Sequence, residues 1–362
     1  MRLSILVLLL SSLAYSQQAT RVAIAPVPSD PHELVSGTIK VLDETDQRAT
    51  VLGLVERARQ NNDLHAPAGH AFDLRVSFEA SGDVAQTGKG QMEELWLEPY
   101  KWRWSATFGS YTQTRLMAGR MYDENPSFLP IRLQMVRGTI FWPIHTGPNE
   151  LLRIAPGTWN GSPVMCVLSS APRWEAAKSA GRSWEESEFC IDTKSGLLQT
   201  YSVAPGIYAV YDYSDAVQFH ASRFPRTITI YESGAAVLTV RVDSLTDPGE
   251  VEAALFQPTP KMASQTTGPV IAGQLHLIAP GGASPTPIEA IQPVIVHALL
   301  DPEGKVQEAE SLQTGNPALS SAAVALVRNS TYAPQQQGRA LQREAFIDVR
   351  FVPAALAQPG GE

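Results

Sequence analysis

The side chains of this 362-residue sequence that could do chemistry are scattered rather than grouped. The tightest group of titratable residues consists of Asp63, His65, His70 and Asp73. It lies between a segment with helical periodicity and an alternating one, which indicates a polar loop rather than a metal site. There is no Gly-x-Ser-x-Gly nucleophile motif. Residues 88–90, Gly-Lys-Gly, lack the strand before and the helix after that a phosphate-binding loop needs.

Three carboxylates, Glu93, Glu94 and Glu98, lie close together in the sequence. Neighbouring residues on a strand face opposite sides, so we expect a solvated strand edge rather than an acid–base pair. We therefore predict no catalytic residue, no metal site and no cofactor, and hence a protein that is not an enzyme. The alternative, an enzyme, would require a convergent polar cluster that this sequence does not display.

An aromatic set is the strongest candidate for a ligand face: Trp96, Trp102, Trp104 and Phe108. Large apolar side chains of this kind line pockets for acyl chains or apolar peptides, but they also form ordinary core under covering helices. Both interpretations stay open at this point. Arg103 and Arg115 are either the contacts of an anionic head group or solvated surface residues.

The sequence contains two cysteines, Cys166 and Cys190, each in a short strand-like run. In an oxidising compartment an even number of cysteines favours a disulfide, and a hairpin of the two runs would bring them face to face. The bond would close a loop of about 25 residues and add roughly 3 kcal/mol of stability in the chain-entropy model. The alternative is two separate buried thiols.

The N-terminus has the pattern of an export signal, with Arg2, an apolar segment over residues 3–13, and small residues at Ala14 and Ser16. We expect cleavage after Ser16 and a periplasmic protein, either free or associated with the outer membrane; an uncleaved anchor is the alternative. No later apolar stretch is long enough to span a bilayer. The formal net charge of −8 argues against a nucleic-acid-binding surface.

Residues 50–61 have the apolar spacing of a helix, and period-two alternation begins near residue 71. We expect strands over residues 72–78, 101–108, 138–142, 163–168, 188–191, 207–213, 227–231 and 236–242. These patterns predict an α+β fold that is mostly β, with a curved antiparallel half-barrel sheet and covering helices, plus a small β-β-α-β C-terminal domain. The expected organisation is a signal peptide (1–16), an extended segment (17–42), the sheet domain (43–258), a Pro/Gly/Thr-rich linker (259–290), the C-terminal domain (291–354) and a tail (355–362). Residues 270–278 are a candidate extra strand inside the linker.

The C-terminal domain resembles the TonB C-terminal domain over residues 291–353. The resemblance is carried by VIVHALLDPEGKV (294–306), NPAL (316–319), YAP (332–334) and FIDVRF (346–351). Asn316 is a residue type that caps helix N-termini, and Pro317 is typical of the first helical position. The resemblance implies a protein-interaction module, with Ile347, Val349 and Phe351 as candidates for a partner-docking edge. The uncleaved membrane helix and long charged spacer of energy-transducing members are missing.

The sheet domain is similar to the LolA family of outer-membrane lipoprotein carriers. The similarity is carried by GQMEELWLEPYKWR (90–103), WNGSPV (159–164), IDTKSGLL (191–198), FPRTITI (224–230) and VRVDSL (240–245). It implies an incomplete antiparallel barrel whose apolar concave face is covered by helices and takes lipid chains.

Together these features predict a periplasmic envelope protein that binds an apolar ligand, a lipid or a lipoprotein acyl chain. Its TonB-like domain would dock it to an envelope protein, such as an outer-membrane transporter or a lipoprotein. The alternative is a pure protein-interaction scaffold, or an accessory of TonB-dependent transport, with no small ligand. Neither hypothesis includes nucleic acid or a transmembrane segment after signal cleavage.

Overall fold

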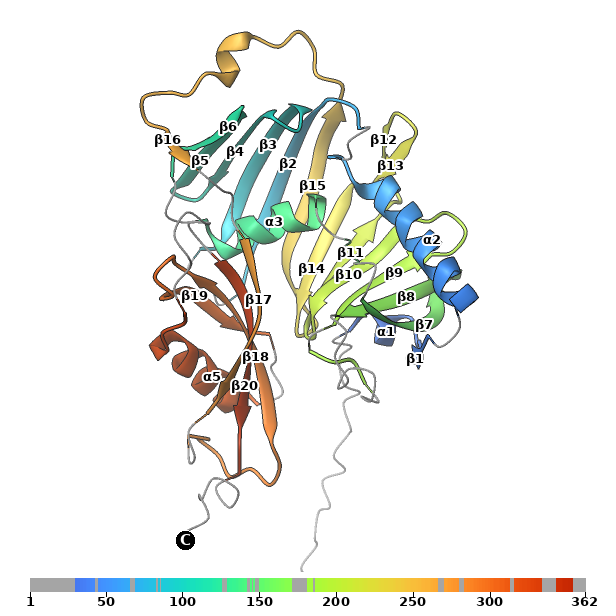
Figure 1. The fold of residues 1–362 in the computed structure, drawn as a ribbon, viewed down its shortest axis with the longest axis vertical. Helices are drawn as coiled ribbons and strands as arrows, with labels where there is room; N and C mark the ends of the chain where they lie inside the picture. Colours follow the sequence, from blue (N-terminus) through green and yellow to red (C-terminus); the bar gives the residue numbers. More distant parts are fainter. Residues whose placement is uncertain are drawn as a thin grey trace, which may run out of the picture.

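Figure 1 shows the computed structural model of the chain. It describes residues 30–42, 45–65, 69–82, 84, 86–125, 129–141, 144, 146, 150–170, 181–184, 186–265, 270–279, 283–312, 316–333 and 343–353. The expected signal peptide and the expected tail lie outside the described residues. Among the helices that are described, none combines the length and the apolar character needed to cross a membrane.

One large antiparallel sheet dominates the fold, as the period-two pattern predicts. Its strand order is β1-β7-β8-β9-β10-β11-β14-β15-β2-β3-β4-β5-β6-β16, and the curved sheet does not close on itself (Figure 1). One half consists of β2 (Phe72–Ala80), β3 (Gly88–Glu98), β4 (Lys101–Phe108), β5 (Tyr111–Ala118), β6 (Arg120–Asp123) and β16 (Ala263–Gln265). Alternate residues of β2 are buried, so one face packs on the core and the other meets solvent.

The other half of the sheet continues the same curvature. Its strands are β1 (Lys40–Val41), β7 (Leu151–Trp159), β8 (Ser162–Ser170), β9 (Ser187–Asp192), β10 (Leu198–Ala204), β11 (Ile207–Asp212), β14 (Thr227–Glu232) and β15 (Ala235–Thr246). A separate hairpin of β12 (Val217–Phe219) and β13 (Ser222–Phe224) projects near helix α2, and a short 3-10 helix, η1 (Ala253–Phe256), follows β15. The expected half-barrel is confirmed.

Two helices cover the concave face. Helix α2 (Thr45–Asn62) includes the expected helix and buries Leu54 and Ala58 against the sheet core. Helix α3 (Ile131–Phe141) includes residues 138–141, where a strand was expected over residues 138–142, so that expectation is wrong; residue 142 lies outside the described residues. The segment Gly-Thr-Ile-Phe-Trp is too short for its periodicity to separate a buried strand from a buried helix. Helix α3 is buried on almost every side because it lies between the large sheet and the C-terminal domain (Figure 1).

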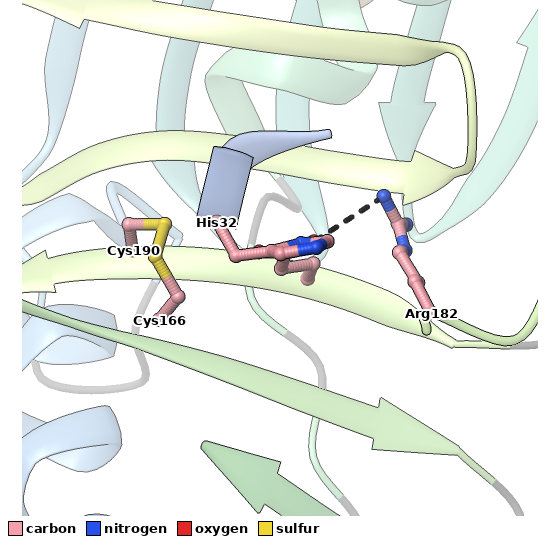
Figure 2. The surroundings of a disulfide bond; sticks show 5 residues. His32, Cys166, Arg182 and Cys190 are labelled. Atoms are coloured by element: carbon pink, nitrogen blue, oxygen red, sulfur yellow. Dashed lines mark hydrogen bonds and ion pairs between the residues drawn. A yellow bond between two sulfur atoms is a disulfide. The ribbon is translucent and has the colours of Figure 1, made fainter. Parts of the chain in front are cut away.

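A short N-terminal strap covers the outer face of β7, β8 and β9. It comprises helix α1 (Pro31–Leu34) and strand β1, so the described part of the expected extended segment is folded. Cys166 and Cys190 are directly opposite each other on β8 and β9 and form the expected disulfide, which is confirmed. Figure 2 shows this disulfide beside the part of the strap that carries His32, close to Arg182. The strap is fixed by buried ion pairs of Arg182 with Asp30 (2.6 Å) and of His32 with Glu188 (3.1 Å).

The C-terminal domain is a four-stranded sheet with one helix. It contains β17 (Val270–Ile278), β18 (Gln292–Leu300), β19 (Val306–Ser311), α5 (Pro317–Asn329) and β20 (Arg343–Phe351). The side chain of Asn316 accepts hydrogen bonds from the backbone amides of Ala318 and Leu319, which confirms the expected cap. Two strands, β16 and β17, form within the span expected to be a linker, and β17 is the expected extra strand.

The strand order of this small sheet is β17-β20-β18-β19. Strand β20 is therefore interior, which corrects the expectation that Ile347, Val349 and Phe351 lie at a sheet edge. The physical reason is that β17 adds to β20 in parallel and covers the edge that a β-β-α-β unit alone would leave free. The three side chains are buried and pack in the apolar core between the sheet and α5. The edges of this sheet are β17 and β19.

The disulfide closes a loop whose cysteines are 24 residues apart. We expect the double substitution Cys166→Ala/Cys190→Ala to lower the free energy of unfolding by roughly 3 kcal/mol, because the unfolded chain regains the loop entropy. Urea unfolding with and without a reductant measures this. The reductant should shift the native protein toward the midpoint of the double variant and leave that variant unchanged; equal midpoints in all four samples would contradict the prediction.

Candidate functional site

The four aromatic residues singled out from the sequence lie on strands β3 and β4 of the large sheet. Trp96, Trp104 and Phe108 are buried in the large core, and Trp102 is half-buried against it. Trp96 and Trp102 are cross-strand neighbours on β3 and β4. The guanidinium of Arg137 on α3 lies 5.9 and 5.8 Å from the ring centres of Trp102 and Trp104, respectively. Trp102 and Trp104 therefore contact the helix, and none of the four lines the cavity described below; their contact with a ligand stays a prediction.

Glu94 faces the concave side of the sheet, where the sequence interpretation expected a solvated edge. It is fully buried, and its carboxylate contacts His65 Nε2 at 2.8 Å and Arg137 at 3.2 Å. Burial alone would raise the pKa of Glu94, but the charge of Arg137 and the hydrogen bond from His65 outweigh burial and lower it. The alternation along β3 could have predicted this burial, because Glu94 lies on the same face of the strand as the buried residues Met92 and Trp96.

Arg115 is buried too, although solvation was one expectation for it. Its guanidinium makes hydrogen bonds of 2.9 and 2.6 Å to Asp123 on β6. It also lies 5.5 Å from the ring centre of Trp104. Arg115 and Arg137 thus form two carboxylate-paired cations on the concave side. Arg103, which lies on the opposite face of β4, is half-exposed.

A cavity of about 130 Å³ lies where the large sheet, α3 and β20 meet. Strands β10, β11 and β14 contribute mainly apolar side chains, among them Val203, Ile207 and Ile230. Helix α3 contributes Gln134, Met135, Gly138 and Thr139, and both arginines named above also line the cavity. The C-terminal domain supplies Glu344 and Phe346. The cavity is therefore built jointly by the two domains.

A buried ionic network joins the two domains beside this cavity. Arg132 on α3 contacts Glu232 of β14 at 2.6 Å and Glu310 of β19 at 2.9 Å. His297 on β18 then contacts Glu310 at 3.4 Å and Glu344 at 2.7 Å. Sequence reasoning missed this network because its members are up to about 200 residues apart. The unbroken apolar run around His297 did indicate a strand that is buried on both faces.

Two groups of side chains bring metal-ligand atoms together in the described part of the chain. The first consists of Glu232, His297 and Glu310, and both of its carboxylates are already paired with the guanidinium of Arg132. The second joins Glu188 to Cys166 and Cys190, whose sulfurs are bonded to each other and are not thiolates. Neither group therefore fits a metal ion.

Backbone and apolar contacts complete the domain interface. The amide of Ile131, at the start of α3, donates a 2.9 Å hydrogen bond to Glu308 of β19. Ile295, Leu312 and Phe346 of the C-terminal domain belong to the same apolar core as the large sheet. Gly206 has φ +88°, and a Cβ there would collide with the carbonyl oxygen of Leu312. The C-terminal domain is therefore packed against the sheet domain and is not joined to it by the linker alone.

The sequence matches no protein-family model and no curated protein. A LolA superfamily protein from Nitrosomonas europaea aligns with 57% of this chain and 97% of its own, at 13% identity and a TM-score of 0.39. MucB aligns with 61% of this chain and 66% of its own, at 14% identity and a TM-score of 0.26. MucB in its complex with MucA(peri) aligns with 68% of this chain and 67% of its own, at 11% identity and a TM-score of 0.24. Likeness at this level assigns neither a family nor an activity to the chain.

We expect Arg132→Met to lower the free energy of unfolding by about 3–5 kcal/mol, because two buried carboxylates lose their counter-charge. The half-exposed pair of Arg75 and Asp73 offers a control, and Arg75→Met should cost about 0–1 kcal/mol. Denaturant unfolding measures both. Adding Glu232→Gln and Glu310→Gln to Arg132→Met should restore part of the stability; no recovery would show that packing, not charge, is what Arg132 provides.

The domain interface should weaken as the pH rises. Burial alone would lower the pKa of His297, but the carboxylates of Glu310 and Glu344 outweigh burial and raise it to about 9. Because the pKa is raised on folding, the stabilisation is complete below pH 6.5 and is lost as the pH rises toward 9. Stability measured from pH 6 to pH 9.5 should fall on the order of 2 kcal/mol more in the native protein than in His297→Gln. The exposed His70→Gln serves as control and should follow the native curve; parallel curves for all three proteins would contradict the prediction.

Proposed function

We propose that this protein binds an apolar group in the cavity between its half-barrel and its C-terminal domain, in the periplasm and without catalysis. The observation that carries the proposal is the cavity itself, whose walls are mainly apolar and come from both domains. The resemblance of the sheet domain to lipoprotein carriers, which rests on sequence motifs, points to the same class of ligand.

The size of the cavity limits what enters it. At about 130 Å³ it is comparable to the apolar cavity of ~150 Å³ that accommodates benzene. A ring or a short stretch of an acyl chain fits this space, and a whole lipid does not. The protein would therefore hold a lipid or a lipoprotein by the end of one chain.

Docking to an envelope partner is the second part of the proposal. The expected candidates on β20 face α5, so strand addition at an edge of the small sheet, β17 or β19, is the route that remains for an extended peptide. An outer-membrane transporter or a lipoprotein is the partner that the TonB-like sequence motifs imply.

The alternative is a protein-interaction scaffold with no small ligand. The aromatic set favours this alternative, because Trp96, Trp104 and Phe108 are buried core rather than walls of an open site.

The experiment uses the exported chain without residues 1–16, purified from periplasm, and begins with native mass spectrometry and lipid extraction. Toluene binding is then measured by titration calorimetry on the native protein, Gly138→Leu and Gly53→Leu. Both glycines are helical, and a Cβ at either meets no atom within 4 Å, but only Gly138 lines the cavity.

We expect Gly138→Leu to fill the cavity and weaken toluene binding by about tenfold or more, which corresponds to ~1.4 kcal/mol. Gly53→Leu should bind as the native protein does, since it changes helix propensity alone. No toluene binding together with no copurifying lipid would overturn the ligand-binding function and favour the scaffold. Equal weakening in both variants would place the binding elsewhere.

A further inference from the structure

Every charged side chain in the cavity wall already has its own counter-charge. Arg115 is paired with Asp123, Arg137 with Glu94, and Glu344 with His297. Among the described residues, the charged side chains that line the cavity are Arg115, Arg137 and Glu344. An additional charge in this space would be desolvated without a partner, which is strongly unfavourable. The cavity therefore disfavours both a carboxylate and an ammonium group.

Gln134 is an uncharged polar side chain of the wall that has an unpaired buried donor. The Nε2 atom of Gln134, on the cavity side of α3, is buried and has no hydrogen-bond partner among the described residues. By contrast, the hydroxyl of Thr139, further along α3, donates to the carbonyls of Met135 and Val136. A buried donor without an acceptor is unfavourable, so a ligand that supplies an acceptor gains more than one that leaves the amide unpaired.

We propose that the cavity selects an uncharged apolar group that carries a hydrogen-bond acceptor, a carbonyl, which the amide of Gln134 recognises. This inference rests on the proposed function and specifies the chemistry of its ligand. The apolar walls from β11, β14 and Phe346 hold the hydrocarbon, and Gln134 on α3 holds the carbonyl oxygen. An acyl ester and an amide share this chemistry; a free fatty acid at neutral pH does not.

Four probes that carry the same number of non-hydrogen atoms separate these contributions: cumene, acetophenone, benzamide and benzoate. Their affinities are measured by titration calorimetry on the full exported chain and on Gln134→Leu, which keeps the side-chain size and removes the amide. A second variant, Gln134→Met, covers the case in which the first is unstable. Cumene reports the apolar walls alone, so it controls for any change in packing.

In the native protein we expect acetophenone to bind at least about tenfold more tightly than benzoate, because the carboxylate has no counter-charge. Gln134→Leu should lower the affinity for acetophenone by about tenfold more than it lowers the affinity for cumene. If benzamide shows the larger loss of affinity, the natural carbonyl belongs to an amide; if acetophenone does, it belongs to a carbonyl group without an N–H, such as that of an acyl ester. Either pattern supports the proposal.

Two outcomes would overturn it. One is benzoate binding more tightly than acetophenone, and the other is equal weakening of cumene and acetophenone by the substitution. Binding of none of the four probes would instead be a failure of the proposed function, so the two failures are distinguishable.

Discussion

The arrangement of the molecule depends on one buried cation, Arg132. Its guanidinium lies between Glu232 of the large sheet and Glu310 of the C-terminal sheet, and it is 1% exposed. A charge taken out of water is tolerated only when its partners are held in place, so both domains must keep this geometry at once. Helix α3, which carries Arg132, is fixed as a result, and with it one wall of the cavity. Two units that the sequence separates by a Pro/Gly-rich stretch thereby share one apolar core.

The concave face of the half-barrel combines aromatic core with paired charges. Arg137 and Arg115 lie over tryptophan rings, while Glu94 and Asp123 neutralise them. This arrangement fills the side under α3 and leaves the space near β20 open and electrically balanced. The cavity therefore differs from a purely apolar one, because its selectivity would come from the amide of Gln134 and from the pairing of every charge in its wall.

The outer face is stabilised by different means. The strap of α1 and β1 covers Cys166 and Cys190, and Arg182 ties Asp30 of the strap to the sheet through a buried ion pair. Only a short segment covers the apolar surface of this face, and no layer of helices does so in the described part of the chain. A disulfide and an ion pair stabilise the structure here. Strand β7 would form this edge of the sheet, but the short strand β1 pairs with it at Arg153 and Ile154, which limits unwanted strand addition there.

The sequence by itself predicted the mostly β class, seven of the fourteen strands of the large sheet, the helix before β2 and the Asn316 cap, and it favoured the disulfide over two free thiols, because each depends on local periodicity or on residue type. It did not determine that residues 138–141 belong to a helix, that β20 is interior, or that Glu94 is buried beside Arg137. These features depend on what packs against each segment: α3 lies between two sheets, β17 covers β20, and α3 brings a counter-charge to Glu94. The cavity and the Arg132 network belong to the same group. Their residues come from positions more than 200 residues apart, and only the docking of the two domains brings them together.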